Sequence, residues 1–232
     1  MDDNIYVSGG YLENNPGWHV GDSPWKAEQI LRMMKKHKLQ PSTLCEVGCG
    51  AGEILARLYE ELGDTQFSGY EVSPQAFELC VTREKERLHF FLGDLLEVQK
   101  RFDLLLCIDV FEHIPNYLFF LEGLRRHADR FIFHIPLDLS LLTVLRPGRL
   151  MQTRYGVGHL HMFTYELALA VLKDTGYDVL DSFFTAGGVE LEKNKRRVRT
   201  VLANLPRRLI GKFSHRLAAQ LLGGYSLLVL AK

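Results

Sequence analysis

The residues with the clearest chemistry lie in the run LCEVGCGAGE, at positions 44–53. Three glycines, Gly48, Gly50 and Gly52, alternate there between a short apolar run and an amphipathic segment, which predicts a strand, a tight turn and a helix. Glycine permits the unusual backbone angles of such a turn and lets a ligand approach the main chain closely. Because the helix also points unpaired N–H groups into the same gap, we expect a nucleotide-like cofactor there.

The spacing of this run distinguishes two classes of cofactor. The dinucleotide fingerprint G-x-G-x-x-G fails, because Glu53 stands where its last glycine would be. The run instead fits acid-x-Gly-x-Gly-x-Gly, with Glu46 as the acid at the end of the first strand. A carboxylate so close to the turn repels a pyrophosphate but favours the cationic amino group of S-adenosylmethionine. The run therefore resembles the first motif of the class I S-adenosylmethionine-dependent methyltransferases.

Two further acids follow predicted strands. Glu71 ends the strand 66–71, about 20 residues beyond the glycines, where a carboxylate accepts hydrogen bonds from both ribose hydroxyls. The alternative is a solvated glutamate at a strand end. In the resembled family an acid after the third strand bonds the adenine amino group and the next backbone unit holds the ring, which assigns these contacts to Asp94 and Leu95. Asp94 can also cap a short helix, and the two roles are compatible.

The fourth predicted strand, 102–108, ends in the sequence DVFEHIP. Open α/β sheets bind ligands beyond the carboxyl ends of their strands, and the resembled family carries a similar run here. We therefore expect Asp109 and His113 closest to the sulfonium and the acceptor, with His113 acting either as a general base or as a support for the loop. The resemblance thus assigns cofactor contacts to Glu46, Gly48, Gly50, Gly52, Glu71, Val72, Asp94, Leu95, Asp109 and Val110.

Two more histidines, His159 and His161, lie in the segment 137–162, which follows the fifth predicted strand and reads as an insertion covering the substrate. Contact with the substrate or deprotonation of the acceptor is the favoured role for both. Their spacing fits neither a helix face nor a zinc finger, and the four cysteines form no C-x-x-C pair. We therefore expect no metal and reduced, packed thiols.

The alternation of strand and helix patterns predicts a doubly wound α/β sheet with helices on both faces. The resemblance implies seven strands in a Rossmann-like methyltransferase fold, the last one antiparallel between the fifth and sixth. We expect a single domain over 1–232, with an amino-terminal lid and helix over 1–40. The aromatic residues of 4–19 belong either to this lid or to a cover over the core. The expected strands are 43–47, 66–71, 88–92, 102–108, 129–135, 177–185 and 227–231.

A second insertion, 187–222, contains a strongly basic stretch at 190–219, where nine lysines and arginines face two acids. Its simplest interpretation is a solvated basic face whose apolar side packs on the core. The alternatives are an anionic substrate such as a nucleotide-linked or lipid-linked sugar, peripheral contact with a membrane, and nucleic acid, although no stacking motif supports the last. The amino terminus lacks a secretory signal pattern, so we expect a cytoplasmic protein.

Together these features predict methyl transfer from S-adenosylmethionine to a hydroxyl, or secondarily an amine, of a small-molecule acceptor. Such a reaction needs alignment, exclusion of water and removal of one proton, for which His113, His159 and His161 are the candidates. Two alternatives stay open: a non-catalytic protein that binds S-adenosylmethionine, and a nucleotide-cofactor oxidoreductase. The sequence does not indicate the oligomeric state.

Overall fold

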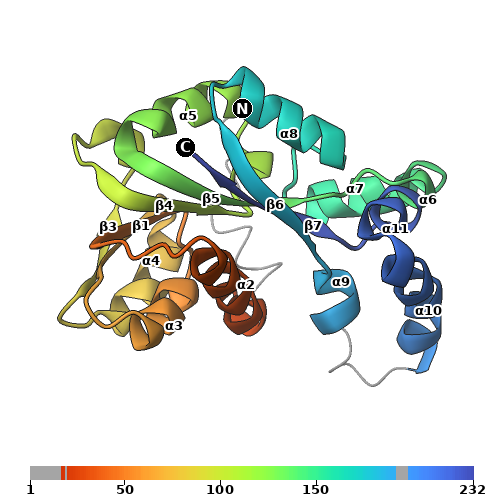
Figure 1. Ribbon diagram of the computed structural model, residues 1–232, viewed down its shortest axis with the longest axis horizontal. Coiled ribbons are helices and arrows are strands. Elements are labelled where there is room, and N and C mark those ends of the chain that lie inside the picture. The colour runs from red at the N-terminus through yellow and green to blue at the C-terminus, as the bar shows by residue number, and fades with distance from the viewer. Residues whose placement is uncertain (1–16, 19, 192–197) are drawn as a thin grey trace.

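A seven-stranded sheet forms the centre of the protein, in the order β3-β2-β1-β4-β5-β7-β6 (Figure 1). The structure is a computed structural model that describes residues 17–18, 20–191 and 198–232. Strands β1 to β5 are parallel, whereas β7 runs antiparallel between β5 and β6. This arrangement confirms the predicted fold. The strands are β1 (Thr43–Val47), β2 (Gln66–Glu71), β3 (Leu88–Leu92), β4 (Phe102–Ile108), β5 (Ala128–Pro136), β6 (Val179–Thr185) and β7 (Ser226–Ala231).

Helices cover both faces of the sheet (Figure 1). One face carries α2 (Ser23–Lys36), α3 (Glu53–Glu61) and α4 (Pro74–Cys80), and the other carries α5 (Tyr117–Leu124) and α8 (Tyr165–Asp174). Two buried hydrophobic clusters fill the layers between sheet and helices. Along β4, Leu105 and Cys107 belong to one cluster, while Leu104 and Leu106 belong to the other. This central strand is therefore buried on both faces, as its continuous apolar sequence predicts.

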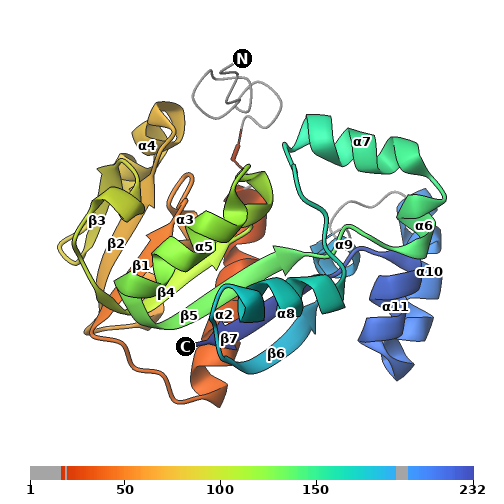
Figure 2. The ribbon, with the colours of Figure 1, turned by 90° about the horizontal axis from the view of Figure 1, so that it is seen from above.

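A second group of helices lies beyond the ends of β5 and β6 (Figure 2). It contains the two segments predicted to be insertions, and its helices contact one another. Among the described residues, no helix combines the length and the apolar composition needed to cross a membrane. The members of this group are α6 (Leu141–Val144), α7 (Pro147–Gly156), α9 (Gly187–Glu190), α10 (Val198–Phe213) and α11 (His215–Leu222).

Several local predictions are refined by the structure. Ser73 followed by Pro74 predicts a helix that begins at Pro74 and runs over 74–85, whereas α4 ends at Cys80 and continues as a 3-10 turn, Val81–Arg83. Ser73 caps this helix by accepting a hydrogen bond from the backbone of Ala76. Asp22 precedes Ser23 and Pro24 and is therefore the predicted cap of α2, but its side chain makes no capping hydrogen bond. The described cysteines, Cys45, Cys49, Cys80 and Cys107, are buried free thiols, as expected.

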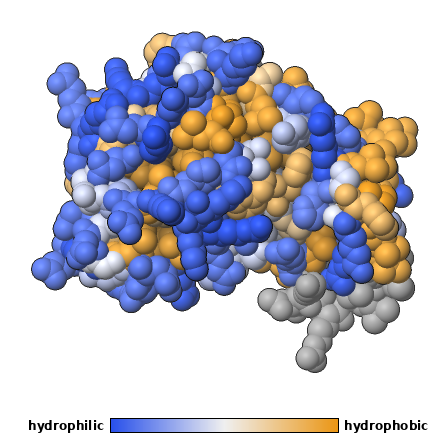
Figure 3. All heavy atoms as spheres, viewed as in Figure 1, coloured by the Kyte–Doolittle hydropathy of each residue, from blue (hydrophilic) through white to orange (hydrophobic). Residues whose placement is uncertain are grey.

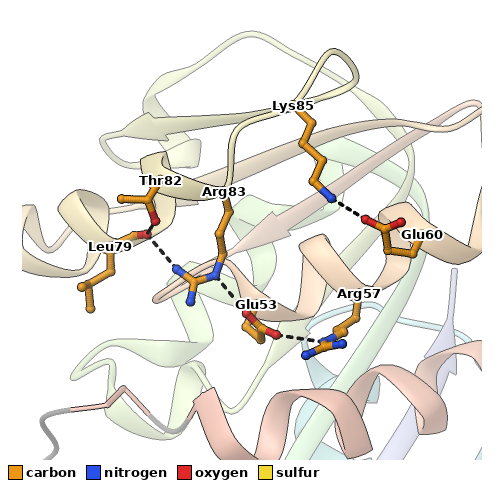
Figure 4. Close-up of polar contacts among 7 residues, drawn as sticks. All are labelled: Glu53, Arg57, Glu60, Leu79, Thr82, Arg83 and Lys85. Carbon is orange, nitrogen blue, oxygen red and sulfur yellow. Dashed lines mark hydrogen bonds and ion pairs between the residues drawn. The ribbon is translucent and has the colours of Figure 1, made fainter.

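The 3-10 turn after α4 is tied to the start of α3 (Figure 4). Arg83 donates one hydrogen bond to the carbonyl of Leu79 at 2.8 Å and another to Glu53 at 2.9 Å. The other carboxylate oxygen of Glu53 accepts from Arg57 at 2.8 Å, and Lys85 pairs with Glu60 nearby. The glutamate that replaces the last fingerprint glycine therefore holds two arginines at the helix start.

We expect that Gly52→Ala lowers the free energy of unfolding by about 2–4 kcal/mol. Gly52 has a positive φ of 76°, and a Cβ there would lie 2.6 Å from the Phe90 ring and 2.9 Å from the Cβ of Cys80. Urea denaturation measures the loss. The matched control is Gly63→Ala, whose Cβ meets no atom within 4 Å and whose expected change is within about 0.5 kcal/mol. Equal stability of the two variants would contradict this packing role.

Candidate active site

A cavity of about 1320 Å³ opens at the carboxyl ends of the parallel strands. Residues of the glycine turn, of the β2 and β4 ends and of α2 form one part of its wall, and residues 153–160 form another. The cavity thus lies at the edge of the sheet where ligands of open α/β folds bind. Most of the predicted lid falls outside the described residues, although Trp18 lines the cavity.

The glycine turn has the conformation that its sequence predicts. Gly48, Gly50 and Gly52 have positive φ values of 65°, 55° and 76°. The amide of Gly48 donates to the carbonyl of Tyr70 at 2.8 Å, which fixes the turn against β2. A Cβ built on Gly50 would lie 3.9 Å from the Trp18 ring, and no other described atom would be within 4 Å of it. Gly50 therefore leaves room for a ligand, whereas Gly52 serves the packing between α3 and the sheet.

Glu46 is the predicted acid beside this turn, and it lines the cavity. Its side chain is 2% exposed, and its Oε2 has no hydrogen-bond partner among the described residues. Burial raises the pKa of Glu46 well above its usual range, against the opposing charge of Lys26. An unsatisfied buried carboxylate oxygen costs about 1–3 kcal/mol or more. A cationic amino group from the cavity would remove this cost, so the residue fits the predicted methionine end of the cofactor.

Glu71 lies at the end of β2 with both oxygens directed at backbone amides. Oε2 accepts from Gly50 at 2.8 Å and Oε1 accepts from Ser73 at 2.8 Å. Burial raises the pKa of Glu71, although these two amides act in the opposite direction. The carboxylate is thus buried, held in place and part of the cavity wall, as a ribose ligand needs to be. The next residue, Val72, is half exposed and also lines the cavity.

Asp94 caps the 3-10 turn Leu95–Glu97, because its Oδ1 accepts from the amide of Leu96 at 2.8 Å. This confirms the capping role, and the contact with adenine stays a prediction. Asp94 and Leu95 both line the cavity, but the side chain of Leu95 is fully buried in the core. Leu95 therefore offers a ligand only its backbone.

Asp109 occupies the cavity wall in a left-handed conformation, with φ at 54°. Its Oδ2 pairs with Lys26 at 2.7 Å, and its Oδ1 accepts from His134 Nδ1 at 2.6 Å. His134 in turn bonds the hydroxyl of Thr185 at 2.9 Å. Burial alone would raise the pKa of Asp109, but the two partners hold it far below its usual range. From the sequence we expected this acid to lie closest to the sulfonium. In the structure one of its carboxylate oxygens pairs with Lys26 on α2 and the other bonds His134 on β5.

Val110 follows Asp109 and also lines the cavity. A Cβ on Gly48 would lie 2.9 Å from a methyl group of Val110. The glycine at that position is therefore needed so that the β1 turn and the β4 loop can approach one another.

His113 and His159 meet in the wall of the cavity, with ring centroids 4.8 Å apart in an edge-to-face arrangement. His113 Nδ1 donates to the carbonyl of Gly158 at 3.1 Å, and His159 Nδ1 bonds Asp138 Oδ2 at 2.6 Å. Burial and the adjacent His159 lower the pKa of His113 to about 4, so its ring is neutral near neutral pH. The loop-supporting role predicted for His113 thus has a defined partner.

His161 lies elsewhere than predicted. It is not among the residues that line the cavity, and its Nε2 donates to the carbonyl of Ile114 at 3.0 Å. Its ring packs on Tyr117, with centroids 4.5 Å apart. His161 therefore stabilises the contact between the β4 loop and the segment before α8, and we remove it from the set of acceptor-side candidates.

The structure adds Lys26, His134 and Asp138 to the site, and sequence reasoning missed all three. Lys26 lies on α2, which the sequence predicts only as the helix within 1–40. His134 and Asp138 are at the end of β5, the strand next to β4 in the sheet. The rule that placed Glu71 and Asp109 at the ends of their strands, applied to β5, could have found these two residues.

Comparison with known proteins agrees with this geometry. Residues 45–130 match the family model described as a methyltransferase domain. Residues 45–130 form a methyltransferase domain. This confirms the family and the type of enzyme that the glycine run predicts.

Solved methyltransferase structures share the fold over most of the chain. Magnesium protoporphyrin IX methyltransferase from Synechocystis PCC 6803, with bound SAH, has a TM-score of 0.61 at 17% identity, over 92% of this chain and 84% of that one. The cyclopropane synthase MmaA2 from Mycobacterium tuberculosis gives 0.57 at 16%, over 88% and 84%. A methyltransferase from Geobacter sulfurreducens, in complex with S-adenosylhomocysteine, gives 0.58 at 15%, over 88% and 90%. These likenesses extend the fold assignment of the methyltransferase domain beyond residues 45–130.

Proposed function

We propose that this methyltransferase transfers the methyl group of S-adenosylmethionine to a hydroxyl, or secondarily an amine, of a small molecule. The observation that carries the proposal is one continuous cavity with two chemically different ends. One end has the glycine turn, Glu46 and Glu71, and the other has the paired imidazoles of His113 and His159. Neighbours of the same fold contain S-adenosylmethionine or its demethylated product, which supports the choice of methyl donor.

The residues at the cofactor end suit the donor in charge and in hydrogen bonding. Bound there, the donor supplies an electrophilic methyl group on a sulfonium. Glu46 would neutralise the amino group, Glu71 would accept from the ribose hydroxyls, and Gly50 keeps the turn open. Alignment and exclusion of water then account for much of the catalysis.

At the other end, the histidines would act on the acceptor. Each ring is oriented by a fixed partner of its Nδ1 atom, the carbonyl of Gly158 for His113 and the carboxylate of Asp138 for His159. The Nε2 atoms are then the nitrogens that a neutral ring offers as acceptors. We also propose that the insertions 137–162 and 187–222 cover the acceptor, because residues 153–160 and Gly187, Gly188 and Leu191 line the cavity.

The surface around these insertions favours an anionic or lipid-linked acceptor. No aspartate or glutamate occurs in 139–165 or in 198–232, which contain Arg146, Arg149 and Arg208 among other basic residues. Figure 3 shows hydrophobic side chains gathered over the end of the molecule where α10 and α11 lie. Basic charge beside exposed apolar groups is typical of surfaces that bind anionic membranes from one side. The exposed apolar residues on and beside α6, α10 and α11 include Leu141, Val144, Leu145, Leu205, Leu209, Phe213 and Leu217.

We expect that the double change Leu209→Ser and Phe213→Ser reduces binding to anionic lipid vesicles at least about tenfold, because each side chain inserted into lipid contributes roughly 1.5–3 kcal/mol. Their side chains are 51% and 91% exposed. Vesicle co-sedimentation measures the change. Leu167→Ser on α8, where the side chain is 48% exposed, is the matched control and should bind as the unaltered protein does. Unchanged binding of the double variant, or no binding by the unaltered protein, would contradict membrane contact.

Methyl transfer itself is tested with a panel of hydroxylated and amine acceptors that includes anionic and lipid-linked sugars. Mass spectrometry should find an acceptor whose mass rises by one methylene, with equimolar S-adenosylhomocysteine. Cofactor binding without transfer to any acceptor would instead favour a non-catalytic binding protein.

The oxidoreductase alternative is weakened by Glu53, whose carboxylate holds Arg57 and Arg83 where the dinucleotide fingerprint has glycine.

A further inference from the structure

We propose that Glu112, His113 and His159 bind a divalent first-row transition metal ion at the acceptor end of the cavity. The side chains offer one carboxylate oxygen and two imidazole nitrogens, and these ligand atoms all lie within 4.8 Å of one another. The sequence predicted no metal, because the spacing of His159 and His161 fits neither a helix face nor a zinc finger. The fold instead pairs His159 with His113, which lies on a different loop.

The distances are close to those of a metal site. His113 Nε2 lies 3.8 Å from Glu112 Oε1. In sites built from two histidines and one glutamate, metal–ligand bonds of about 2.0–2.2 Å place the ligand atoms roughly 3.3–3.6 Å apart. Side-chain rotations that move the ligand atoms by about 1 Å would therefore bring all three within bonding distance of one ion.

Both histidines have the supporting contacts of metal ligands. In metal sites the second ring nitrogen is usually bonded to a carboxylate or a backbone carbonyl, which fixes the tautomer and the orientation of the ring. Here His159 Nδ1 bonds Asp138 at 2.6 Å, and His113 Nδ1 bonds the carbonyl of Gly158 at 3.1 Å. A carbonyl only accepts, so the neutral ring of His113 carries its lone pair on Nε2.

The buried carboxylate of Glu112 is a second observation, independent of the histidine geometry, that points to a bound cation. Its side chain is fully buried, and neither carboxylate oxygen has a hydrogen-bond partner among the described residues. Its backbone carbonyl accepts from the amides of Leu160 and His161, which joins the two loops that carry the histidines. A divalent cation would supply the missing charge and the missing partner.

The role of the ion rests on the methyl transfer proposed above. A divalent cation lowers the pKa of a hydroxyl that it contacts, in the way that zinc lowers the pKa of water. With both Nε2 atoms bound to the ion, the histidines would act on the acceptor through the metal, and the acceptor hydroxyl would release its proton to solvent. Its oxygen would then form a bond to the methyl carbon while the carbon–sulfur bond breaks, and a neutral thioether would leave. The donor set of two nitrogens and one oxygen favours zinc, cobalt or manganese over magnesium, which prefers oxygen ligands.

Cobalt titration of the full chain, freed of metal by a chelator, tests the site. We expect one Co²⁺ per chain, visible absorption bands of a nitrogen- and oxygen-ligated ion, and displacement by Zn²⁺. Glu112→Gln and His159→Asn should each weaken the affinity at least about 100-fold. Asp138→Asn should weaken it roughly 10–100-fold, because it removes a supporting contact only. The control is His89→Asn, since His89 is exposed on β3.

S-adenosylmethionine binding, measured on the same samples, separates loss of the site from loss of the fold. Variants that keep this binding and lose the cobalt spectrum support the proposal. Protein that binds S-adenosylmethionine but no cobalt would overturn the metal site and leave the proposed function intact. Unchanged cobalt affinity in the Glu112 and His159 variants would also overturn it. Metal binding without methyl transfer to any acceptor would support the site and contradict the proposed function.

Discussion

Replacing Glu71 with alanine is expected to weaken the binding of S-adenosylmethionine by about 100-fold. The carboxylate is buried at the end of β2, and the amides of Gly50 and Ser73 hold it in the cavity wall. Hydrogen bonds to a charged acceptor contribute about 1.5–3 kcal/mol each, and two lost bonds that are partly replaced by water leave a deficit of about 2.7 kcal/mol. Calorimetric titration of the variant gives the dissociation constant.

Glu78→Ala provides the control for Glu71→Ala, because Glu78 is an exposed glutamate on α4. Thermal unfolding of both variants shows whether the fold is kept, which matters because Glu71 also bonds the glycine turn. A Glu71→Ala protein that stays folded and keeps full affinity would show that another group holds the ribose.

Lys26→Met is expected to lower the free energy of unfolding by about 2–4 kcal/mol. Lys26 and Asp109 form an ion pair at 2.7 Å, with side chains only 16% and 22% exposed. Removing one partner of a buried pair leaves the other charge uncompensated, which typically costs 3–5 kcal/mol. The expected loss is smaller here because the pair borders the cavity and Asp109 keeps His134. Urea denaturation measures the loss.

The double variant Lys26→Met with Asp109→Asn separates the ion pair from packing effects. Asparagine tolerates the positive φ of 54° at position 109, so the double variant removes the unpaired charge without backbone strain. We expect it to recover at least about 1 kcal/mol relative to Lys26→Met. A double variant that is less stable than the single one would contradict the electrostatic explanation.

The strands of this fold were predictable because their sequence signals are local. The bounds of β1, β2, β3 and β4 agree with the expectation to the residue, since each is a short apolar run that ends at a glycine or an acid. The place of β7 between β5 and β6 came from family resemblance, because periodicity does not reveal which strands pair. The early end of α4 was not predictable from local signals; Arg83, at the end of the 3-10 turn that follows α4, has its partner Glu53 on another helix.

The candidate site was predictable where one strand end carries one acid, as with Glu46 and Glu71. It was not predictable where the function of a side chain depends on a partner from another element. The pairing of Asp109 with Lys26 joins β4 to α2, and that of His113 with His159 joins two loops. Among the described residues the carboxylate of Glu112 lacks a hydrogen-bond partner, and this becomes visible only when the packing around it is known.

Calorimetric titration of the full chain, stripped of bound ligand, tests the central claim most directly. S-adenosylmethionine, S-adenosylhomocysteine and NAD are compared on the same preparation. Our account predicts one site per chain for the first two, with dissociation constants on the order of micromolar, and no heat with NAD. Binding of NAD alone, or no binding of either S-adenosyl compound, would contradict it.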